Sequence, residues 1–308
     1  MSSIAVVFPG QGSQYVGMGQ ALCQASPAAK AVFEAAESLS TLPIQRLCFE
    51  GPLEELTQTI NLQPAVVAVD LACWLALQEA GVKPVAVAGH SLGEYPALVA
   101  CGAISVAEAL RLVSLRGRLM EREANAHPGA MSAIMGLSPD AVMQLTQEAG
   151  GVVQPANYNT PQQTVITGAV DAVAAAGALA KSRGAKAIPL KVSGAWHSPF
   201  MEAAGVDMRS ALEEVVFQPL NCAHVPNTTG QPTRDAAVAR QEIMGQLTSP
   251  VRWVQTVQAL LAMGVDTFIE AGPKNVLAGL IKKTAPEGVR VFNVEDPAGL
   301  ATVLDALG

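Results

Sequence analysis

The strongest constraint on the fold is a serine held between two glycines at the end of a short apolar run. Residues 85–88 are apolar, and Gly89-His90-Ser91-Leu92-Gly93 follows, before a segment that suits a helix. Roughly 0.1 matches to G-x-S-x-G are expected by chance in a chain of this length. The motif needs a sharp turn that lifts the serine oxygen above the sheet edge, with glycines giving the backbone room. It predicts a strand-turn-helix unit with Ser91 as nucleophile and the Leu92 N–H facing a developing oxyanion.

Other segments repeat this alternation of strand and helix. Residues 4–8 form an apolar run that stops at Pro9-Gly10, and residues 65–79 suit an apolar helix. Further strands are expected at 267–270 and 289–293. The pattern predicts an α/β fold with a parallel sheet covered by helices.

The middle of the chain has a different order of elements. Ser105 and Glu108 form a capping box that starts a long helix to about Glu123, and the loop 126–129 follows. Beyond it the order is βαββαβ, typical of a ferredoxin-like module, with strands at 131–135, 152–156, 164–167 and 187–190 and helices at 139–148 and 171–183. We therefore predict an insert over residues 127–194 in a large domain formed by residues 1–126 and 195–308.

Composition excludes several classes of function. The chain has 308 residues, 50% of them hydrophobic, and a net charge of −7, so a nucleic-acid partner is not expected. The N-terminus lacks the features of a secretory signal, and no apolar run is expected to reach membrane-spanning length. Five scattered cysteines without a CxxC pair argue against a disulfide framework or a metal site and favour a reduced, cytoplasmic protein.

A serine nucleophile needs a base, and the chain has only four histidines. His90 adjoins the nucleophile and should point away from it, His127 lies in the boundary loop, and His224 lies in an apolar stretch. His197 stands where the chain re-enters the large domain, so it is the predicted base. The alternative for any single histidine is a structural role at the surface or in the core.

The third member of a catalytic triad is not evident. Asp266 and Glu270 lie in the appropriate part of the chain, but neither has a convincing context. A backbone carbonyl that accepts the Nδ1 proton could orient the imidazole instead.

Arg116 is the most informative charged residue. It falls within the apolar stripe formed by Leu112, Leu115 and Leu119 on the long helix, so it should face the interior. An unpaired buried guanidinium is costly, so Arg116 must find an anion. That anion is either an internal carboxylate or a carboxylate of the substrate held bidentately.

The turn at residues 10–14 carries two glycines but does not fit a dinucleotide-binding loop. The pattern G-x-G-x-x-G would need glycine at position 15, which is Tyr15, and no GK[ST] motif occurs. A glycine-rich turn at the end of a strand can instead offer a backbone N–H to an anion, here from Gln11.

Together these segments resemble the malonyl-CoA:acyl carrier protein transacylases of bacterial fatty acid synthesis and the related acyltransferase domains of polyketide synthases. The resemblance spans nearly the whole chain. Its markers are Phe8-Pro9-Gly10-Gln11-Gly12-Ser13-Gln14, Gln63-Pro64-Ala65, Gly89 to Tyr95, Leu115-Arg116-Gly117-Arg118, Trp196-His197-Ser198 and Ser249-Pro250-Val251-Arg252-Trp253.

This resemblance implies an α/β-hydrolase-like large domain, a ferredoxin-like insert and a role for each matching residue. Ser91 would be the nucleophile, His197 the base and Arg116 the ligand of the malonyl carboxylate. The N–H groups of Gln11 and Leu92 would form the oxyanion hole. The remaining expected site residues are Gln246, whose main-chain carbonyl would orient the histidine, and His90, Gln63, Asn157 and Trp196 in the substrate pocket. Trp196 stands where the family usually has Phe, a departure that could narrow the pocket.

The implied reaction is a ping-pong transfer from malonyl-CoA to a holo acyl carrier protein, by a monomer that needs no permanently bound cofactor. Coenzyme A enters as the thioester substrate. A standalone polyketide or malonate-decarboxylase malonyltransferase remains an alternative, since this chain does not separate the pathways. A thioesterase or other serine hydrolase is a further alternative, as is a carrier-binding scaffold without activity.

Overall fold

The computed structural model describes residues 2–308; Met1, the first residue of the predicted large domain, lies outside that range. Its larger sheet has five parallel strands in the order β7-β2-β1-β8-β9. They are β1 (Ile4–Phe8), β2 (Ala86–Gly89), β7 (Ala223–Val225), β8 (Thr267–Ala271) and β9 (Arg290–Val294). The predicted parallel sheet is confirmed, whereas β7 was not predicted.

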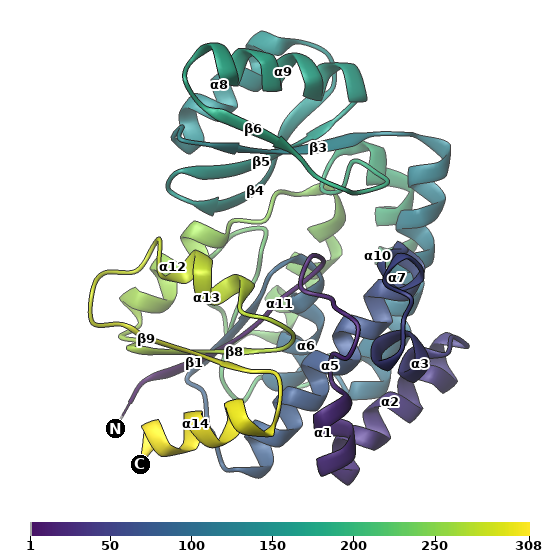
Figure 1. The fold of residues 1–308 in the computed structure, drawn as a ribbon, viewed down its shortest axis with the longest axis vertical. Coiled ribbons are helices and arrows are strands. Elements are labelled where there is room, and N and C mark those ends of the chain that lie inside the picture. The colour runs from purple at the N-terminus through teal and green to yellow at the C-terminus, as the bar shows by residue number, and fades with distance from the viewer. Residues whose placement is uncertain (1) are drawn as a thin grey trace.

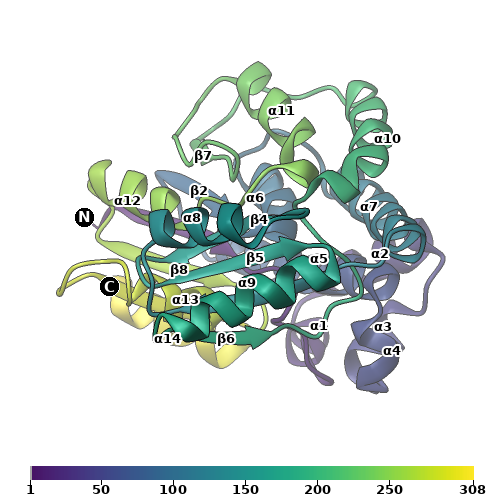
Figure 2. The same cartoon turned by 90° about the horizontal axis from the view of Figure 1, so that it is seen from above.

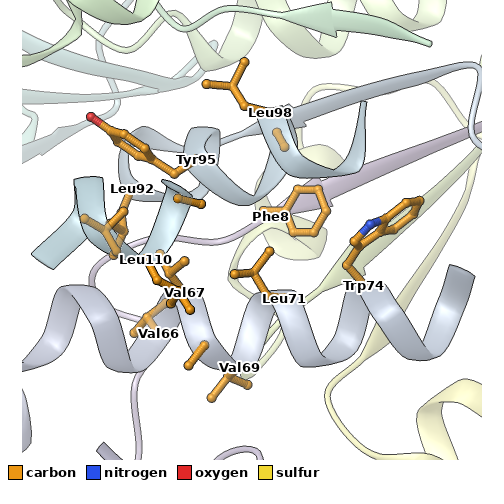
Figure 3. Close-up of a cluster of buried hydrophobic side chains, with 14 of the residues drawn as sticks. Phe8, Val66, Val67, Val69, Leu71, Trp74, Leu92, Tyr95, Leu98 and Leu110 are labelled. Atoms are coloured by element: carbon orange, nitrogen blue, oxygen red, sulfur yellow. The ribbon is translucent and has the colours of Figure 1, made fainter. Parts of the chain in front are cut away.

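The two faces of this sheet carry separate cores. On β1, Val6 and Phe8 pack in the core formed with α5 (Thr59–Glu79) and α7 (Val106–Ala126). Figure 3 shows Phe8 above Leu71 and beside Trp74 of α5, and the Phe8 and Trp74 rings meet edge to face with their centroids 6.4 Å apart. The alternate β1 residues pack with α12 (Trp253–Ala262) and α13 (Val276–Ile281) on the other face. Because side chains alternate along a strand, this sheet is covered by helices on both sides.

Helix α5 corrects one expectation from the sequence. Its 21 residues are long and apolar enough to cross a membrane, although no run of that length was expected. The helix is buried inside the protein over nearly all of its length, with 89% of its most apolar window covered. A helix that is apolar all round can be a core helix as well as a membrane span, and here it forms the centre of the larger core.

The smaller sheet is antiparallel, with the order β4-β5-β3-β6. Its strands are β3 (Ala130–Met135), β4 (Val153–Thr160), β5 (Gln163–Gly168) and β6 (Lys186–Pro189). With α8 (Pro139–Ala149) and α9 (Val170–Ser182) they follow the predicted βαββαβ order, although β4 runs on to Thr160. Both helices cover the outer face of this sheet (Figures 1 and 2).

The inner face of the smaller sheet joins the core of the larger unit. Ile134 and Ile166 pack under α8 and α9, whereas Ala133 and Val165 belong to the same core as Trp196. Polar side chains on this inner face can therefore reach the carboxyl ends of the larger sheet, where β2 ends at Gly89.

The remaining elements are mostly helical. Helix α7 begins with the predicted capping box, in which Ser105 Oγ accepts the Glu108 N–H at 3.2 Å and Glu108 Oε2 accepts the Ser105 N–H at 2.7 Å. The other helices are α1 (Gln20–Ala25), α2 (Pro27–Ser40), α3 (Ile44–Phe49), α4 (Leu53–Thr57), α6 (Glu94–Ala100), α10 (Glu202–Glu213), α11 (Ala236–Met244) and α14 (Pro297–Leu307), with short 3-10 turns η1 (Ser91–Gly93), η2 (Pro199–Met201) and η3 (Gln246–Thr248).

Candidate active site

The turn between β2 and α6 places Ser91 at the end of the parallel sheet in a strained conformation. Its φ is 52°, a left-handed value that is uncommon for a residue other than glycine. A Cβ on Gly89 would lie 1.9 Å from the carbonyl of Gly93, and one on Gly93 would lie 2.0 Å from Phe8 O. Only glycine fits at both positions, which explains the spacing of the motif around Ser91.

Asn227 holds this turn from the side. Its Oδ1 accepts the Ser91 N–H at 2.6 Å, and its Nδ2 donates to Gly89 O at 2.6 Å. Asn227 is fully buried, two residues after β7. Sequence analysis missed it because β7 was treated as an undistinguished apolar stretch. A short apolar run followed by Pro226-Asn227-Thr228 was the available signal for a strand ending at the same sheet edge.

His197 contacts Ser91, the predicted nucleophile, directly. Its Nε2 lies 2.8 Å from Ser91 Oγ, while Nδ1 lies 2.9 Å from Ser249 O and 3.1 Å from Gln246 O. Because carbonyl oxygens only accept, Nδ1 carries the proton and Nε2 presents its lone pair to the hydroxyl. Burial, with the Arg116 charge as the second cause, lowers the pKa of His197 to about 3. The ring is therefore neutral and able to accept a proton.

Neither acidic candidate contacts His197. Glu270 accepts the N–H groups of Leu277 and Ala278 at the start of α13, and Asp266 accepts the Thr267 hydroxyl. Two main-chain carbonyls occupy the position of the third group instead. The carbonyl of Gln246 was expected from the resemblance, whereas that of Ser249 was not.

Arg116 lies buried beside the nucleophile, with its side chain turned into the interior as predicted. Its guanidinium donates to Gln63 Oε1 at 2.9 Å, Ser91 Oγ at 3.0 Å and Gln246 Oε1 at 3.2 Å. Within residues 2–308 no carboxylate lies within 4.0 Å of it, and its Nε has no hydrogen-bond partner. Burial lowers the pKa of Arg116 from its ordinary value. In residues 2–308 no internal carboxylate therefore forms a direct ion pair with Arg116; Glu94 is linked to it through Gln246, and the charge of Glu94 opposes the effect of burial on the pKa of Arg116.

These groups open into one small cavity between the two sheets. Its volume is about 100 Å³, and its lining is Gln11, His90, Ser91, Leu92, Arg116, Met120, Met131, Asn157, Leu190, Val192, Trp196 and His197. Larger hollows exist, including one of about 560 Å³ next to it, but none of them contains the nucleophile. Residues 2–308 contain no group of three or more His, Cys, Asp or Glu side chains placed to hold a metal ion.

The structure brings eight of the ten residues expected in the site into the cavity lining, and the other two lie behind it. Gln63 and Gln246 both accept from Arg116. His90 lines the cavity, and its Nε2 lies 2.8 Å from Asn159 Oδ1 on β4. The four lining residues that were not predicted are apolar and belong to no motif: Met120, Met131, Leu190 and Val192.

Comparison with known proteins agrees with this geometry. A family model described as acyl transferase domain matches residues 5–302. The malonyl CoA-acyl carrier protein transacylase of Bacillus subtilis is 41% identical over 100% of this chain and 98% of its own length. The chain belongs to this acyltransferase family.

Solved structures of family members have the same fold. The malonyl CoA-acyl carrier protein transacylase of Coxiella burnetii has a TM-score of 0.95 at 36% identity, covering 99% of this chain and 98% of that one. A malonyl-transacylase solved in complex with its type II polyketide synthase acyl-carrier protein has a TM-score of 0.94 at 38% identity. The match covers 99% of this chain and 100% of that one. Family membership thus extends over both sheets and the cavity between them.

Proposed function

We propose that the chain transfers a malonyl group from malonyl-CoA to the phosphopantetheine thiol of a holo acyl carrier protein, through an ester on Ser91. The observation that carries the proposal is the position of Arg116. A buried guanidinium lies 3.0 Å from the nucleophilic oxygen, without an internal carboxylate. An acyl group that brings its own carboxylate supplies the missing partner, and malonyl is such a group.

The first half of the reaction acylates Ser91. His197 Nε2 takes the hydroxyl proton as Ser91 Oγ attacks the thioester carbonyl, and the oxyanion faces the N–H groups of Leu92 and Gln11. The carbon–sulfur bond then breaks, and the coenzyme A sulfur leaves with the proton held on His197. The main-chain carbonyls of Gln246 and Ser249 keep the imidazole in the required tautomer, since both lie within 3.1 Å of Nδ1.

The second half returns the enzyme to its first state. His197 removes the proton of the pantetheine thiol, the sulfur attacks the ester carbonyl, and Ser91 Oγ leaves as the proton passes back to it. The narrow cavity, with its apolar lining from Met120, Met131 and Val192, supports transfer to a thiol over hydrolysis because it limits access of water.

The remaining predicted residues have supporting parts in this proposal. Gln63, which is not part of the cavity lining, accepts from the guanidinium of Arg116, and Asn157 and Trp196 shape the space for the acyl chain. His90 lines the same space while its ring bridges to Asn159 of the smaller sheet.

The approach of the carrier protein is expected beside Lys191. Lys191 lines the hollow of about 560 Å³ that adjoins the catalytic cavity, and Gln11 and Val192 line both. Carrier proteins are typically acidic, so Lys191 is the contact expected to favour docking on this chain of net charge −7, in a lining that also contains Glu54 and Glu121. The pantetheine arm would enter through this hollow.

The architecture is proposed in the same terms. The βαββαβ order and the strand order β4-β5-β3-β6 support a ferredoxin-like insert over residues 127–194. The sharp turn at residues 89–93, the nucleophile elbow that follows β2, supports an α/β-hydrolase-like domain over 1–126 and 195–308. We further propose a cytoplasmic monomer that has no permanently bound cofactor and no nucleic-acid or membrane partner.

The test is intact-protein mass spectrometry after brief mixing with malonyl-, acetyl- or methylmalonyl-CoA, followed by a chase with holo carrier protein. Preferential malonyl labelling of the wild type, no labelling of Ser91→Ala and passage of the label to the carrier are the expected results. Equal acetyl labelling with decay to water would make the chain a thioesterase. Chasing with carriers of fatty acid and polyketide type distinguishes the two pathways.

A further inference from the structure

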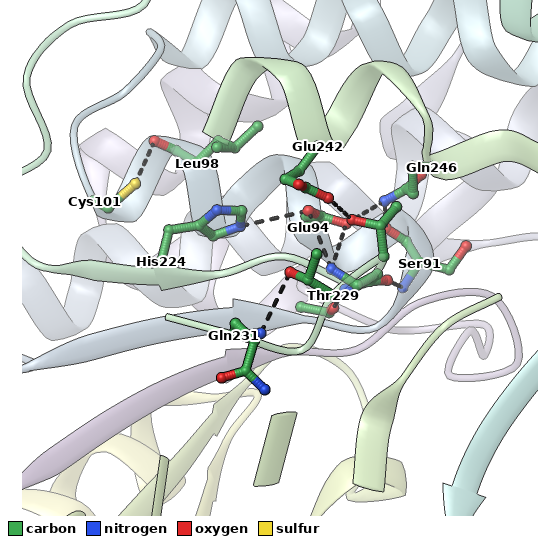
Figure 4. A network of polar contacts seen from close by, with 12 residues as sticks. Ser91, Glu94, Leu98, Cys101, His224, Thr229, Gln231, Glu242 and Gln246 are labelled. Atoms are coloured by element: carbon green, nitrogen blue, oxygen red, sulfur yellow. Dashed lines mark hydrogen bonds and ion pairs between the residues drawn. The ribbon is translucent and has the colours of Figure 1, made fainter. Parts of the chain in front are cut away.

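Glu94 is a buried acid that has no part in the reaction scheme above. It is the first residue of α6, three positions after the nucleophile, and its side chain is fully buried. Figure 4 shows its carboxylate between His224 and Gln246, close to Ser91. Burying an isolated carboxylate costs free energy of folding, so the groups that Glu94 contacts indicate its role.

The strongest of these contacts is with Gln246. Glu94 Oε2 accepts from Gln246 Nε2 at 2.6 Å, while the Asn227 N–H lies 3.4 Å from both carboxylate oxygens and His224 Nε2 lies 3.6 Å from Oε1. Burial raises the pKa of Glu94, whereas the hydrogen bonds from Gln246 and Asn227 and the charge of Arg116 favour the ionised form. Both hydrogen-bond partners of its oxygens, Gln246 Nε2 and the Asn227 N–H, are donors, so Glu94 acts as an acceptor. Burial also lowers the pKa of His224 to about 3, so that ring is a neutral neighbour.

The orientation of Gln246 follows from this contact. Its Nε2 donates both to Glu94 and to Ser91 O, the latter at 2.8 Å. An amide whose NH2 end faces two acceptors must turn its oxygen the other way, and Oε1 accepts from Arg116 Nη2 at 3.2 Å. The main-chain oxygen of the same residue faces His197 Nδ1. Gln246 therefore touches the nucleophile, the base and the carboxylate-binding arginine together.

We infer that Glu94 is a positioning residue for this reaction, which holds the side-chain amide of Gln246 so that it supports both the Ser91 carbonyl and Arg116. The inference rests on the proposed function as far as it concerns malonyl. Glu94 also faces the Asn227 N–H, and Asn227 is the residue that holds the elbow at Ser91 N and Gly89 O. One carboxylate thus orients two of the groups that fix the turn.

The test compares Glu94→Gln with Glu270→Gln. An amide at position 94 keeps the shape but replaces one acceptor oxygen with an NH2 donor, so a donor faces a donor at either Gln246 or Asn227. Glu270 is an equally buried acid that accepts two backbone N–H groups at α13 and does not touch the site. Its substitution measures what loss of a buried carboxylate does to the fold alone.

Two rates of Ser91 modification are measured for each variant. The first is acylation by malonyl-CoA and by acetyl-CoA, expressed as a ratio because misfolding lowers both rates equally. We expect Glu94→Gln to lower the malonyl rate about tenfold and the ratio about fivefold, and Glu270→Gln to leave the ratio unchanged. The second is labelling by a fluorophosphonate, which needs Ser91 and His197 but no carboxylate pocket. Fluorophosphonate labelling of Ser91 should also be slower in Glu94→Gln than in the wild type when circular dichroism shows the same folded fraction for both.

These outcomes separate the two proposals. If malonyl-CoA does not label the wild type, the proposed function fails, while the fluorophosphonate comparison still decides the role of Glu94. The positioning role would be overturned if Glu94→Gln kept the wild-type ratio of malonyl to acetyl acylation rates and its fluorophosphonate labelling slowed only in proportion to the folded fraction. If Glu94→Gln does not fold, Glu94→Asp is measured instead, because its shorter side chain keeps the carboxyl group but moves it away from Gln246. A reduced ratio of malonyl to acetyl acylation rates in Glu94→Asp supports the inference, and an unchanged ratio refutes it.

Discussion

Replacing Arg116 with alanine is expected to remove selectivity for a carboxylated acyl group while leaving the attack of Ser91 largely intact. The guanidinium has no carboxylate within 4.0 Å in the described chain, yet it lies 3.0 Å from Ser91 Oγ. The side chain is therefore placed to meet an anion of the acyl group and has no internal ion pair to lose.

The magnitude follows from the bonds that the carboxylate would make. A hydrogen bond to a charged group contributes about 1.5–3 kcal/mol, and a bidentate pair makes two of them. Binding the carboxylate means giving up the present contacts of Arg116 with Ser91 Oγ and Gln246 Oε1, so we take about 3 kcal/mol as the net gain. That corresponds to a loss of about 100-fold in kcat/KM for malonyl-CoA in Arg116→Ala. For acetyl-CoA, which has no carboxylate, the change should stay within about threefold.

The assay is stopped-flow or quenched labelling of Ser91 by each thioester, read by mass. Arg118→Ala is the matched control, since Arg118 lies on the same helix and is exposed. Arg116→Lys keeps the charge but loses the planar fork, so it should fall between the wild type and Arg116→Ala. If the malonyl and acetyl rates fall by the same factor in Arg116→Ala, Arg116 supports the structure and does not select the substrate.

Three further predictions follow from the geometry. Because the folded pKa of His197 is lowered to about 3, the neutral base persists in acid, and Ser91 labelling should stay level from about pH 8 to about pH 5. In Arg116→Ala the loss of rate on the acid side of the pH profile should move to higher pH, because the positive charge that lowers the pKa of His197 is gone. If the wild-type rate already falls near pH 6.5, the low pKa of His197 is wrong. Gly93→Ala should lower the free energy of unfolding by more than about 3 kcal/mol in urea, whereas Gly279→Ala, whose Cβ would have open space, should not. Asn227→Ala should slow fluorophosphonate labelling about 100-fold, because the two 2.6 Å hydrogen bonds that hold the elbow are lost; a rate within threefold of wild type would show that the elbow holds itself.

Local patterns made much of the site predictable. Gly89 is required by a contact within the turn and Gly93 by the neighbouring strand β1. Their spacing around Ser91, between an apolar run and a helical segment, was enough to identify the turn. Arg116 was identified in the same way, since three leucines on one helix face fix the direction of that face. His197 followed from a count of only four histidines, not from any pattern around it.

The site groups that could not be predicted from the sequence lie on segments far along the chain from the residues that they contact. Asn227 and Ser249 meet Ser91 and His197 across more than 50 residues, and no periodicity encodes such a meeting. Helix α5 shows the opposite limit, since apolar length alone does not distinguish a core helix from a membrane span. The burial that decides the matter is a property of the folded chain.

If Arg116 selects the substrate as proposed, its hydrogen bond to Ser91 would connect substrate selection with the strength of His197 as a base. In the free protein Ser91 Oγ accepts from the guanidinium at 3.0 Å while its own proton faces His197 Nε2. The same positive charge is the second cause of the low pKa of His197. A carboxylate that draws the guanidinium to itself frees a lone pair of the nucleophile and neutralises that charge, so the imidazole becomes a stronger base when malonyl is bound. An acetyl group does neither. The preference for a carboxylated substrate should therefore appear in the rate of acylation as well as in binding, and the selectivity of Arg116→Ala and its pH profile report on one interaction.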